Sequence, residues 1–213
     1  MKTIYIGSDH GGLELRQEIL IYLMRHGYNA LDQGTFEIGA VDYPKYAQMV
    51  SISVAKDAGS FGILICKSGN GMTITANKKH GIRAVSYIDK ERVVLARQHN
   101  DANVICFGAG YITSEKAIEA IAAFIETPFS NEERHQNRIL QIESAEELQK
   151  SMLGPEILFA LGCLLLIVGL FSFNSHSWIS SLLRIIAIFG GAIYVATWSY
   201  KYAIFSYLEK HKT

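Results

Sequence analysis

The sequence predicts a doubly wound α/β domain with a parallel sheet. Short apolar runs typical of strands alternate with segments of helical periodicity through the first 150 residues. The run Phe61–Cys66 contains no charged residue and is apolar throughout, as expected of a strand buried on both faces of such a sheet. Ligands of such sheets bind beyond the carboxyl ends of the strands, so the turns after the strands are the places to look for a site.

The first half of the alternation begins with the strand Lys2–Gly7, which is β-branched and aromatic and ends in a glycine-rich turn. The helix Leu13–His26 follows, with leucines and isoleucines at near-helical spacing, and Gly27 ends it. Asn29–Asp32 is expected to be a short strand. Tyr46–Ala58 is expected to be a helix because alanines and valines recur along one side.

The second half begins with the buried strand Phe61–Cys66, a polar turn at residues 67–71 and a helix to about Lys79. Pro128 ends a later helix, because a proline disfavours helical conformation in the residue before it. The remaining expected elements are the strand Arg83–Tyr87, the helix Asp89–His99, the strand Val104–Phe107, the helix Glu115–Glu126 and a charged final helix, Asn131–Gln149.

Charge divides the chain into two parts. Residues 1–151 carry 16 basic and 18 acidic residues, whereas residues 152–213 carry 4 and 2. The formal net charge of zero gives no basic surface for non-specific nucleic-acid binding, so we exclude a nucleic-acid partner. We expect residues 1–150 to form one domain and residues 152–208 to form a separate segment.

The second segment is strongly apolar. Ile157–Phe173 has no charge over 17 residues, and Leu182–Tyr200 has one, Arg184, over 19 residues. A transmembrane helical hairpin in the lipid bilayer is the main interpretation, and a buried helical hairpin packed on the first domain is the alternative. Lys150 precedes the two apolar stretches and Lys201, Lys210 and Lys212 follow them, which predicts a membrane-anchored protein with its first domain in the cytoplasm.

The three cysteines, Cys66, Cys106 and Cys163, are scattered and form no CxxC motif. Neither a disulfide framework nor a zinc site is expected. Cys66 lies between a buried strand and a helix, a position that favours a reactive thiolate near backbone N–H groups. A buried structural cysteine is the alternative.

Other candidate residues are open to two interpretations when taken alone. His99 could end a helix or act as an acid or base. Arg134 and Arg138 lie on one face of a helix, where they could bind a phosphate or simply face solvent. Asp9 and His10 follow the first strand and stay ambiguous in isolation.

Taken together and in order, several blocks closely resemble the type B ribose-5-phosphate isomerases, a family shared with galactose-6-phosphate and allose-6-phosphate isomerases. The resemblance covers residues 2–143. The blocks are Gly7–Gly12, Asp42–Pro44, Gly62–Cys66, Ser68–Gly71, Ala76–Lys78, Gly81–Ala84, Arg97–Asn103, and Arg134-His135 with Arg138. The resemblance implies a Rossmann-like three-layer α/β/α sandwich with a five-stranded parallel sheet, homodimers or tetramers with shared active sites, and no metal or organic cofactor.

The resemblance also implies roles for individual residues. Cys66 would be the base that moves a proton between C2 and C1, and His99 would assist opening of the sugar ring. Ser68 and the turn around it, with Lys67, Gly69, Asn70 and Gly71, would hold the enediolate. The sugar hydroxyls would contact Asp9, Tyr43 and Asn100, and the phosphate would bind His10, Arg134 and Arg138.

Three features depart from the family pattern. Lys67 stands where glycine is usual after the cysteine, and Gly110 stands where an arginine that helps to bind phosphate is common. Asn131-Glu132-Glu133 replaces a stretch often rich in glycine. The lysine could crowd the pocket or favour the Cys66 thiolate.

These observations predict an isomerase that interconverts ribose 5-phosphate and ribulose 5-phosphate, with a phosphorylated sugar as its partner. One alternative keeps the chemistry but takes a hexose 6-phosphate. The other alternative is a non-catalytic sugar-phosphate-binding module tethered to a membrane.

Overall fold

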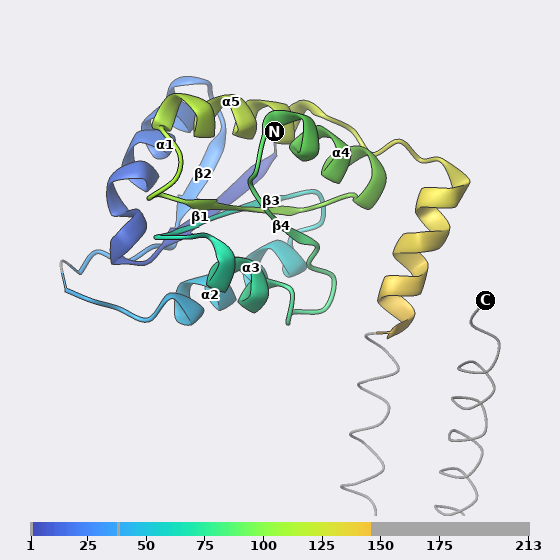
Figure 1. Ribbon diagram of the computed structural model, residues 1–213, viewed down its shortest axis with the longest axis horizontal. Helices are drawn as coiled ribbons and strands as arrows, with labels where there is room; N and C mark the ends of the chain where they lie inside the picture. Colours follow the sequence, from blue (N-terminus) through green and yellow to red (C-terminus); the bar gives the residue numbers. More distant parts are fainter. Residues whose placement is uncertain (1, 38, 146–213) are drawn as a thin grey trace, which may run out of the picture. The chain divides into compact units, whose positions relative to one another are not determined.

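The computed structural model describes residues 2–37 and 39–145, which form a three-layer α/β/α sandwich around a five-stranded parallel sheet (Figure 1). The strands lie in the order β2-β1-β3-β5-β4, and each pairs in parallel with its neighbours. Their bounds are β1 Thr3–Ser8, β2 Asn29–Asp32, β3 Phe61–Cys66, β4 Ala84–Ser86 and β5 Val104–Gly108. The predicted sheet is confirmed.

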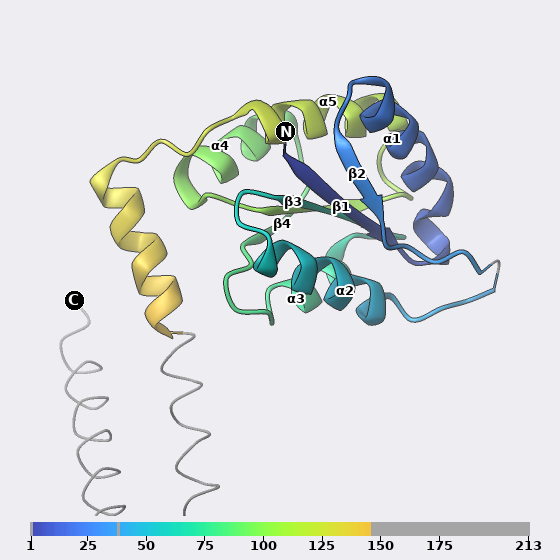
Figure 2. The ribbon, with the colours of Figure 1, turned by 180° about the vertical axis from the view of Figure 1, so that it is seen from behind.

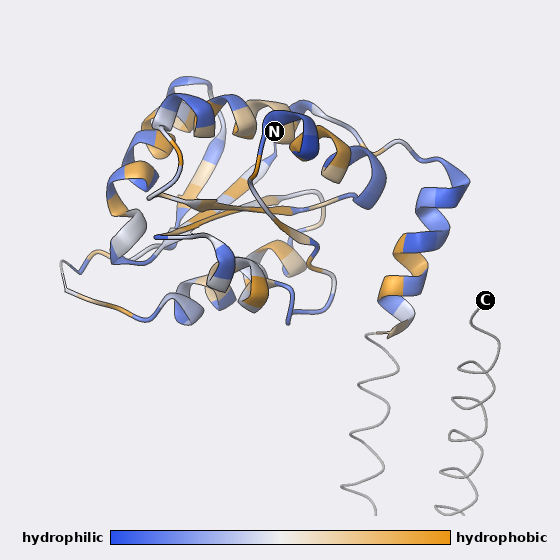
Figure 3. Ribbon diagram, viewed as in Figure 1, coloured by the Kyte–Doolittle hydropathy of each residue, from blue (hydrophilic) through white to orange (hydrophobic). Residues whose placement is uncertain are grey.

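Helices cover both faces of the sheet. Their bounds are the 3-10 turn η1 His10–Gly12, then α1 Leu13–Arg25, α2 Tyr43–Lys56, α3 Asn70–Ala76, α4 Lys90–Asn100 and α5 Ser114–Glu126. Figures 1 and 2 show α1, α4 and α5 on one face and α2 and α3 on the other. Each side has its own core, with Ile19 and Phe124 in the first and Val50 and Met72 in the second. Figure 3 shows hydrophobic residues along the strands between these helices.

The departures from the predicted elements lie mainly at helix ends. α2 begins at Tyr43 rather than Tyr46, because Pro44 fits the first turn of a helix, where its missing N–H is not needed. α3 ends at Ala76, and the side chain of Asn77 then exchanges two hydrogen bonds of 2.8 Å with the backbone of Ala84. The predicted final helix, Asn131–Gln149, is helical over residues 133–145, and the rest of it lies outside the described residues.

A buried arginine fixes the loop that follows β2. The Arg16 side chain is 2% exposed and donates to Ser8 Oγ at 3.0 Å and to the Thr35 carbonyl at 2.7 Å. Its Nε lies 3.4 Å from Asp32. Gly34 has no space for a side chain, because the guanidinium of Arg16 occupies the position that a Cβ would take. Arg16 therefore ties this loop to the carboxyl end of β1.

The predicted hairpin over residues 152–208 lies outside the described residues. The contacts within the chain divide it into two compact units, Met1–Glu143 and Ser144–Thr213. Among residues 2–37 and 39–145, none of the helices has the length and apolar character needed to span a bilayer.

Candidate active site

The turns after β1 and β3 pack against each other at the carboxyl edge of the sheet. The Asp9 N–H donates to the carbonyl of Ile65 at 3.3 Å. A Cβ added to Gly11 would lie only 3.3 Å from the backbone nitrogen of Lys67. The sheet therefore brings together two turns that are more than fifty residues apart in the sequence, as the topology predicts.

Cys66 is held at the base of the second turn. Its side chain is 5% exposed, and its Sγ accepts a hydrogen bond of 3.1 Å from the N–H of Gly69. Gly69 has φ +79°, and a Cβ there would also lie 3.1 Å from the nitrogen of Gly108. Only glycine fits this conformation and this space without strain, so Gly69 directs a backbone N–H at the sulfur.

Tyr43 reaches the same place from α2. Its ring lies over Gly71, where an added Cβ would be 2.5 Å from Tyr43 Cζ. The side chain is 39% exposed, so the phenol borders the site and also faces solvent. Tyr43, Cys66 and the 67–71 turn thus form one cluster.

Asp9 and His10 complete this edge. Asp9 is 7% exposed and accepts a hydrogen bond of 2.9 Å from the Gly11 N–H, and burial raises the pKa of its carboxyl. His10 Nδ1 accepts a hydrogen bond of 3.2 Å from the Val41 N–H. In neutral His10 the proton therefore lies on Nε2, which can donate to a ligand.

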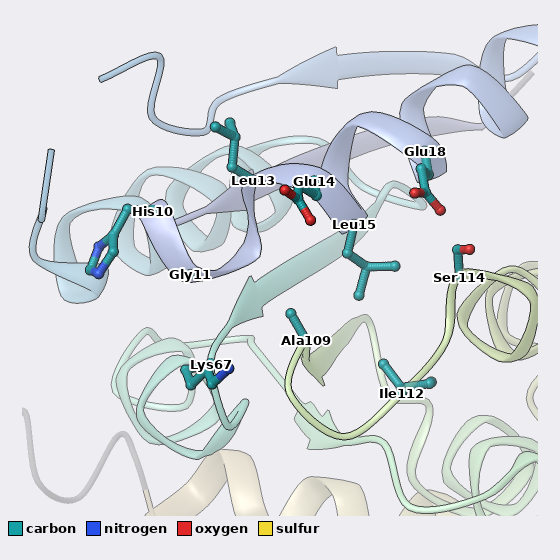
Figure 4. A pocket seen from close by; sticks show the side chains of 10 residues that line it. All are labelled: His10, Gly11, Leu13, Glu14, Leu15, Glu18, Lys67, Ala109, Ile112 and Ser114. Atoms are coloured by element: carbon teal, nitrogen blue, oxygen red, sulfur yellow. The ribbon is translucent and has the colours of Figure 1, made fainter. Parts of the chain in front are cut away.

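Two cavities open on either side of the 67–70 turn. The larger, of about 470 Å³, is shown in Figure 4. Its lining is His10, Gly11, Leu13, Glu14, Leu15, Glu18, Lys67, Ala109, Ile112 and Ser114. The smaller, of about 330 Å³, is lined by Ser68, Asn70, Tyr87, Ile88, Gly108, Tyr111 and Ile112. Ser68 and Lys67 thus face different cavities.

The other predicted site residues lie at the opposite edge of the sheet. His99 and Asn100 end α4, just before the start of β5, whereas Cys66 pairs with Gly108 at the end of β5. Five residues of strand, at about 3.3 Å each, separate these edges by about 16 Å. A single copy of the chain therefore does not bring His99 to Cys66.

This second group has its own organisation. The His99 ring lies 4.3 Å from the His135 ring, and Ser130 Oγ lies 2.7 Å from His135 Nδ1. Arg134 and Arg138 are exposed, and Arg134 pairs with Glu132 at 2.7 Å. The carboxylates expected near the anion site are thus present. One of them, Glu132, forms an ion pair with Arg134, a residue predicted to bind the phosphate.

Two supporting residues were not predicted. His135 stands in the motif Arg134-His135, but the sequence assigned it no role, and only the fold shows its contact with His99. Arg97 donates to Asp101 Oδ1 at 2.8 Å and to the Ala102 carbonyl at 2.6 Å, which fixes the end of α4. The i, i+4 spacing of Arg97 and Asp101 was the available signal.

Cys106 differs from Cys66. It is 1% exposed in the middle of β5, and burial raises the pKa of its thiol to about 12. A thiol with that pKa stays protonated at neutral pH and is a structural residue. Within the described residues, no group of three or more His, Cys, Asp or Glu side chains could hold a metal ion.

The His99–His135 contact predicts a pH dependence of stability. Burial of the His135 ring lowers its pKa, and His99 lowers it further. Between this lowered pKa and the ordinary value of about 6.5, the unfolded chain binds more protons than the folded chain. The stability contributed by neutral His135 is therefore complete above about pH 6.5 and is lost as the pH falls through the folded value.

We expect His135→Gln, which cannot be protonated, to lose less thermal stability than the unaltered chain between about pH 7.5 and about pH 5.5. Thermal unfolding at both pH values measures this. Asp9, whose pKa burial raises, contributes the opposite sign at lower pH in both proteins, so their difference isolates His135. An equal loss in both proteins would show that His135 does not cause the dependence.

Known proteins are similar to the first two thirds of this chain. The family model described as Ribose/Galactose Isomerase matches residues 4–142. Ribose-5-phosphate isomerase B of Escherichia coli K12 is 40% identical over 147 residues, which cover 69% of this chain and 98% of that protein.

Two solved structures are similar in fold and sequence. The type B ribose 5-phosphate isomerase of Trypanosoma brucei has a TM-score of 0.65 and 40% identity, covering 68% of this chain and 99% of its own. Ribose-5-phosphate isomerase B of Mycoplasma genitalium, solved with bound ribulose 5-phosphate, has a TM-score of 0.66 and 37% identity, covering 68% and 96%.

These comparisons correct the predicted location at a membrane. The relatives match over almost their whole length, and these matches cover 69% and 68% of this chain. The described helices include none that could cross a bilayer. The expectation rested on the hydropathy of residues 152–208 and on the lysines around the apolar stretches, and neither the described fold nor the relatives support an anchored protein.

Proposed function

The chain belongs to the Ribose/Galactose Isomerase family, and from this membership we propose that it interconverts ribose 5-phosphate and ribulose 5-phosphate. The relatives named above carry that activity in their names. The observation that supports the chemistry most directly is the hydrogen bond from the Gly69 N–H to the buried sulfur of Cys66.

In the proposed reaction, Cys66 acts as the base. Its thiolate takes the proton from C2 of the open-chain sugar, and the electrons of the broken C–H bond form an enediolate. The resulting thiol returns the proton to C1, while a proton moves from O2 to O1, so the aldose becomes a ketose with all atoms retained. A base of this kind typically contributes about 10²–10⁴-fold to the rate.

The turn beside Cys66 supplies the donors that an enediolate needs. Ser68 and Asn70 of this turn line the smaller cavity, and the backbone N–H groups of residues 67–71 are proposed as further donors. Donors fixed before the reaction stabilise the developing oxyanion without having to reorganise. Gly69, Asn70 and Gly71 serve here through their backbone.

Asp9, Tyr43 and Asn100 are proposed to bind the sugar hydroxyls. The raised pKa of Asp9 suits a carboxyl that exchanges hydrogen bonds with hydroxyl groups. His10 on one edge, with Arg134 and Arg138 on the other, is proposed to bind the phosphate, which supplies binding energy remote from the reacting carbons.

A complete site of this kind requires two copies of the chain. The base and the enediolate turn lie at one edge of the sheet, and His99, Asn100, Arg134 and Arg138 lie at the other. We therefore propose a homodimer, or a tetramer made of two such dimers, in which the His99 edge of one copy meets the Cys66 edge of its partner. A two-fold axis would create two equal sites.

The family description names both ribose and galactose isomerases, so the preferred substrate is either a pentose or a hexose phosphate. An isomerase assay across pentose 5-phosphates and hexose 6-phosphates tests the proposal. We expect turnover of ribose 5-phosphate to exceed that of every hexose 6-phosphate. Preferential turnover of a hexose 6-phosphate would show that the substrate is a hexose and would leave the proposed chemistry unchanged. Absence of turnover across the panel would refute the proposal.

A further inference from the structure

Lys67 and Gly110 lie directly opposite each other at the carboxyl edge of the sheet. Two hydrogen bonds continue the pairing of β3 and β5 past the ends of the strands: the Ala109 N–H donates to the Cys66 carbonyl at 2.8 Å, and the Gly110 N–H donates to the Lys67 carbonyl at 3.1 Å. The backbones of the two turns are therefore held in a fixed register beyond the sheet.

The Lys67 side chain runs across the backbone of Gly110. A Cβ added to Gly110 would lie 3.1 Å from Lys67 Cε and 3.3 Å from its Nζ. Such distances are shorter than ordinary van der Waals contacts, so a Cβ at residue 110 would require the end of the lysine side chain to shift by a few tenths of an ångström. The absence of a side chain at Gly110 thus allows the ammonium to occupy this position.

The ammonium at this position borders the larger cavity and has no anionic partner in the protein. Lys67 makes no ion pair or hydrogen bond through its ammonium within residues 2–37 and 39–145. Arg16, which also lies near this edge, is buried and already bound to Ser8, Thr35 and Asp32. Lys67 and His10 are therefore the basic side chains that line this cavity.

The cavity has an uneven distribution of charge. Figure 4 shows His10 and Lys67 toward one side and Glu18 and Ser114 toward the other, with Glu14 on α1 between them. Carboxylates repel a phosphate, so an anion entering the cavity is directed to the side of His10 and Lys67. Residues 1–151 have slightly more acidic than basic side chains, so no general positive field can replace this local pair.

We infer that Lys67 is a phosphate-binding residue for the sugar phosphate, and that Gly110 is the residue that makes room for it. This inference rests on the proposed function for the identity of the ligand. Lys67 would contribute from the same copy that supplies Cys66, and so it would hold the phosphate close to the base even before a second copy completes the site.

The test is steady-state kinetics of the full chain with ribose 5-phosphate. Loss of one hydrogen bond to a charged group raises KM about tenfold. We expect that increase for Lys67→Ala with kcat and its pH profile unchanged, and a much smaller increase for Lys67→Arg, which keeps the charge. A change in the kcat pH profile instead would assign Lys67 to the ionisation of Cys66 and overturn the inference.

Gly110 provides the matched control. A Cβ at Gly110 would also lie 3.2 Å from the backbone oxygen of Lys67, which Lys67→Ala keeps. Gly110→Ala should therefore raise KM more in the presence of Lys67 than in the Lys67→Ala background, where its effect through the ammonium is absent. Additive effects of the two substitutions, or an unchanged KM for Lys67→Ala, would overturn the inference.

A second measurement separates this inference from the proposed reaction. Binding of inorganic phosphate to the full chain, measured by titration calorimetry, requires no turnover. Weaker phosphate binding by Lys67→Ala supports the inference even if the chain does not convert ribose 5-phosphate. Equal phosphate binding by Lys67→Ala and the unaltered chain overturns it even if the isomerase activity is present.

Discussion

Replacing Cys66 with alanine should reduce the interconversion of ribose 5-phosphate and ribulose 5-phosphate by about 10²–10⁴-fold, because the reaction would lose its proposed base. The substitution removes only one sulfur atom, from a side chain that is 5% exposed. Because the change is this small, we expect the variant to remain folded. A coupled assay for ribulose 5-phosphate gives the rate, and thermal unfolding shows whether the variant is folded.

Cys106→Ala is the matched control for this experiment. It removes the same atom from the neighbouring strand, at a residue that is 1% exposed and whose pKa is raised to about 12. We expect this variant to keep its kcat and to lose some stability, since a small cavity replaces the sulfur. If Cys66→Ala kept full activity, or if Cys106→Ala lost as much, Cys66 would not be the base.

Mixed subunits should recover activity that neither parent has. Cys66→Ala and His99→Asn are each expected to be nearly inactive as homodimers. Co-expressed in equal amounts, they should form mixed dimers in which one of the two sites has both an intact Cys66 and an intact His99. Random assortment then predicts about a quarter of the activity of the unaltered chain.

This recovery depends on the distance between the two edges of the sheet. If Cys66 and His99 of one copy acted together, every site in the mixed dimers would lack one residue, and the mixture would be as inactive as its parents. Size-exclusion chromatography of the mixture, with one variant carrying an affinity tag, confirms that mixed dimers are present. Their presence without recovered activity would contradict the shared site.

The fold was largely predictable because its signals are local. Phe61–Cys66 is apolar at every position and forms β3 with all six residues buried. The glycine-rich turn after the first strand and the proline after α5 likewise act on adjacent residues. Helix ends were less predictable, since the start of α2 depends on whether Pro44 is included in the first turn.

The site was predictable only in part, because its decisive contacts join distant residues. The order of the strands places the turn at Gly11 beside Lys67, and a parallel sheet already implies that such turns meet at its carboxyl edge. In contrast, the contact of Lys67 with Gly110 and that of His99 with His135 depend on the packing of separate turns and helices. The sequence marked Lys67 and Gly110 as two separate departures, whereas in space they form one feature.

The most direct test of the central claim is incubation of the purified full chain with ribose 5-phosphate in deuterated water, followed by NMR. Transfer of a proton through an enediolate and an exchangeable thiol predicts ribulose 5-phosphate that carries deuterium at C1. Recovery of unchanged ribose 5-phosphate, with hydrogen retained at C2, would contradict it.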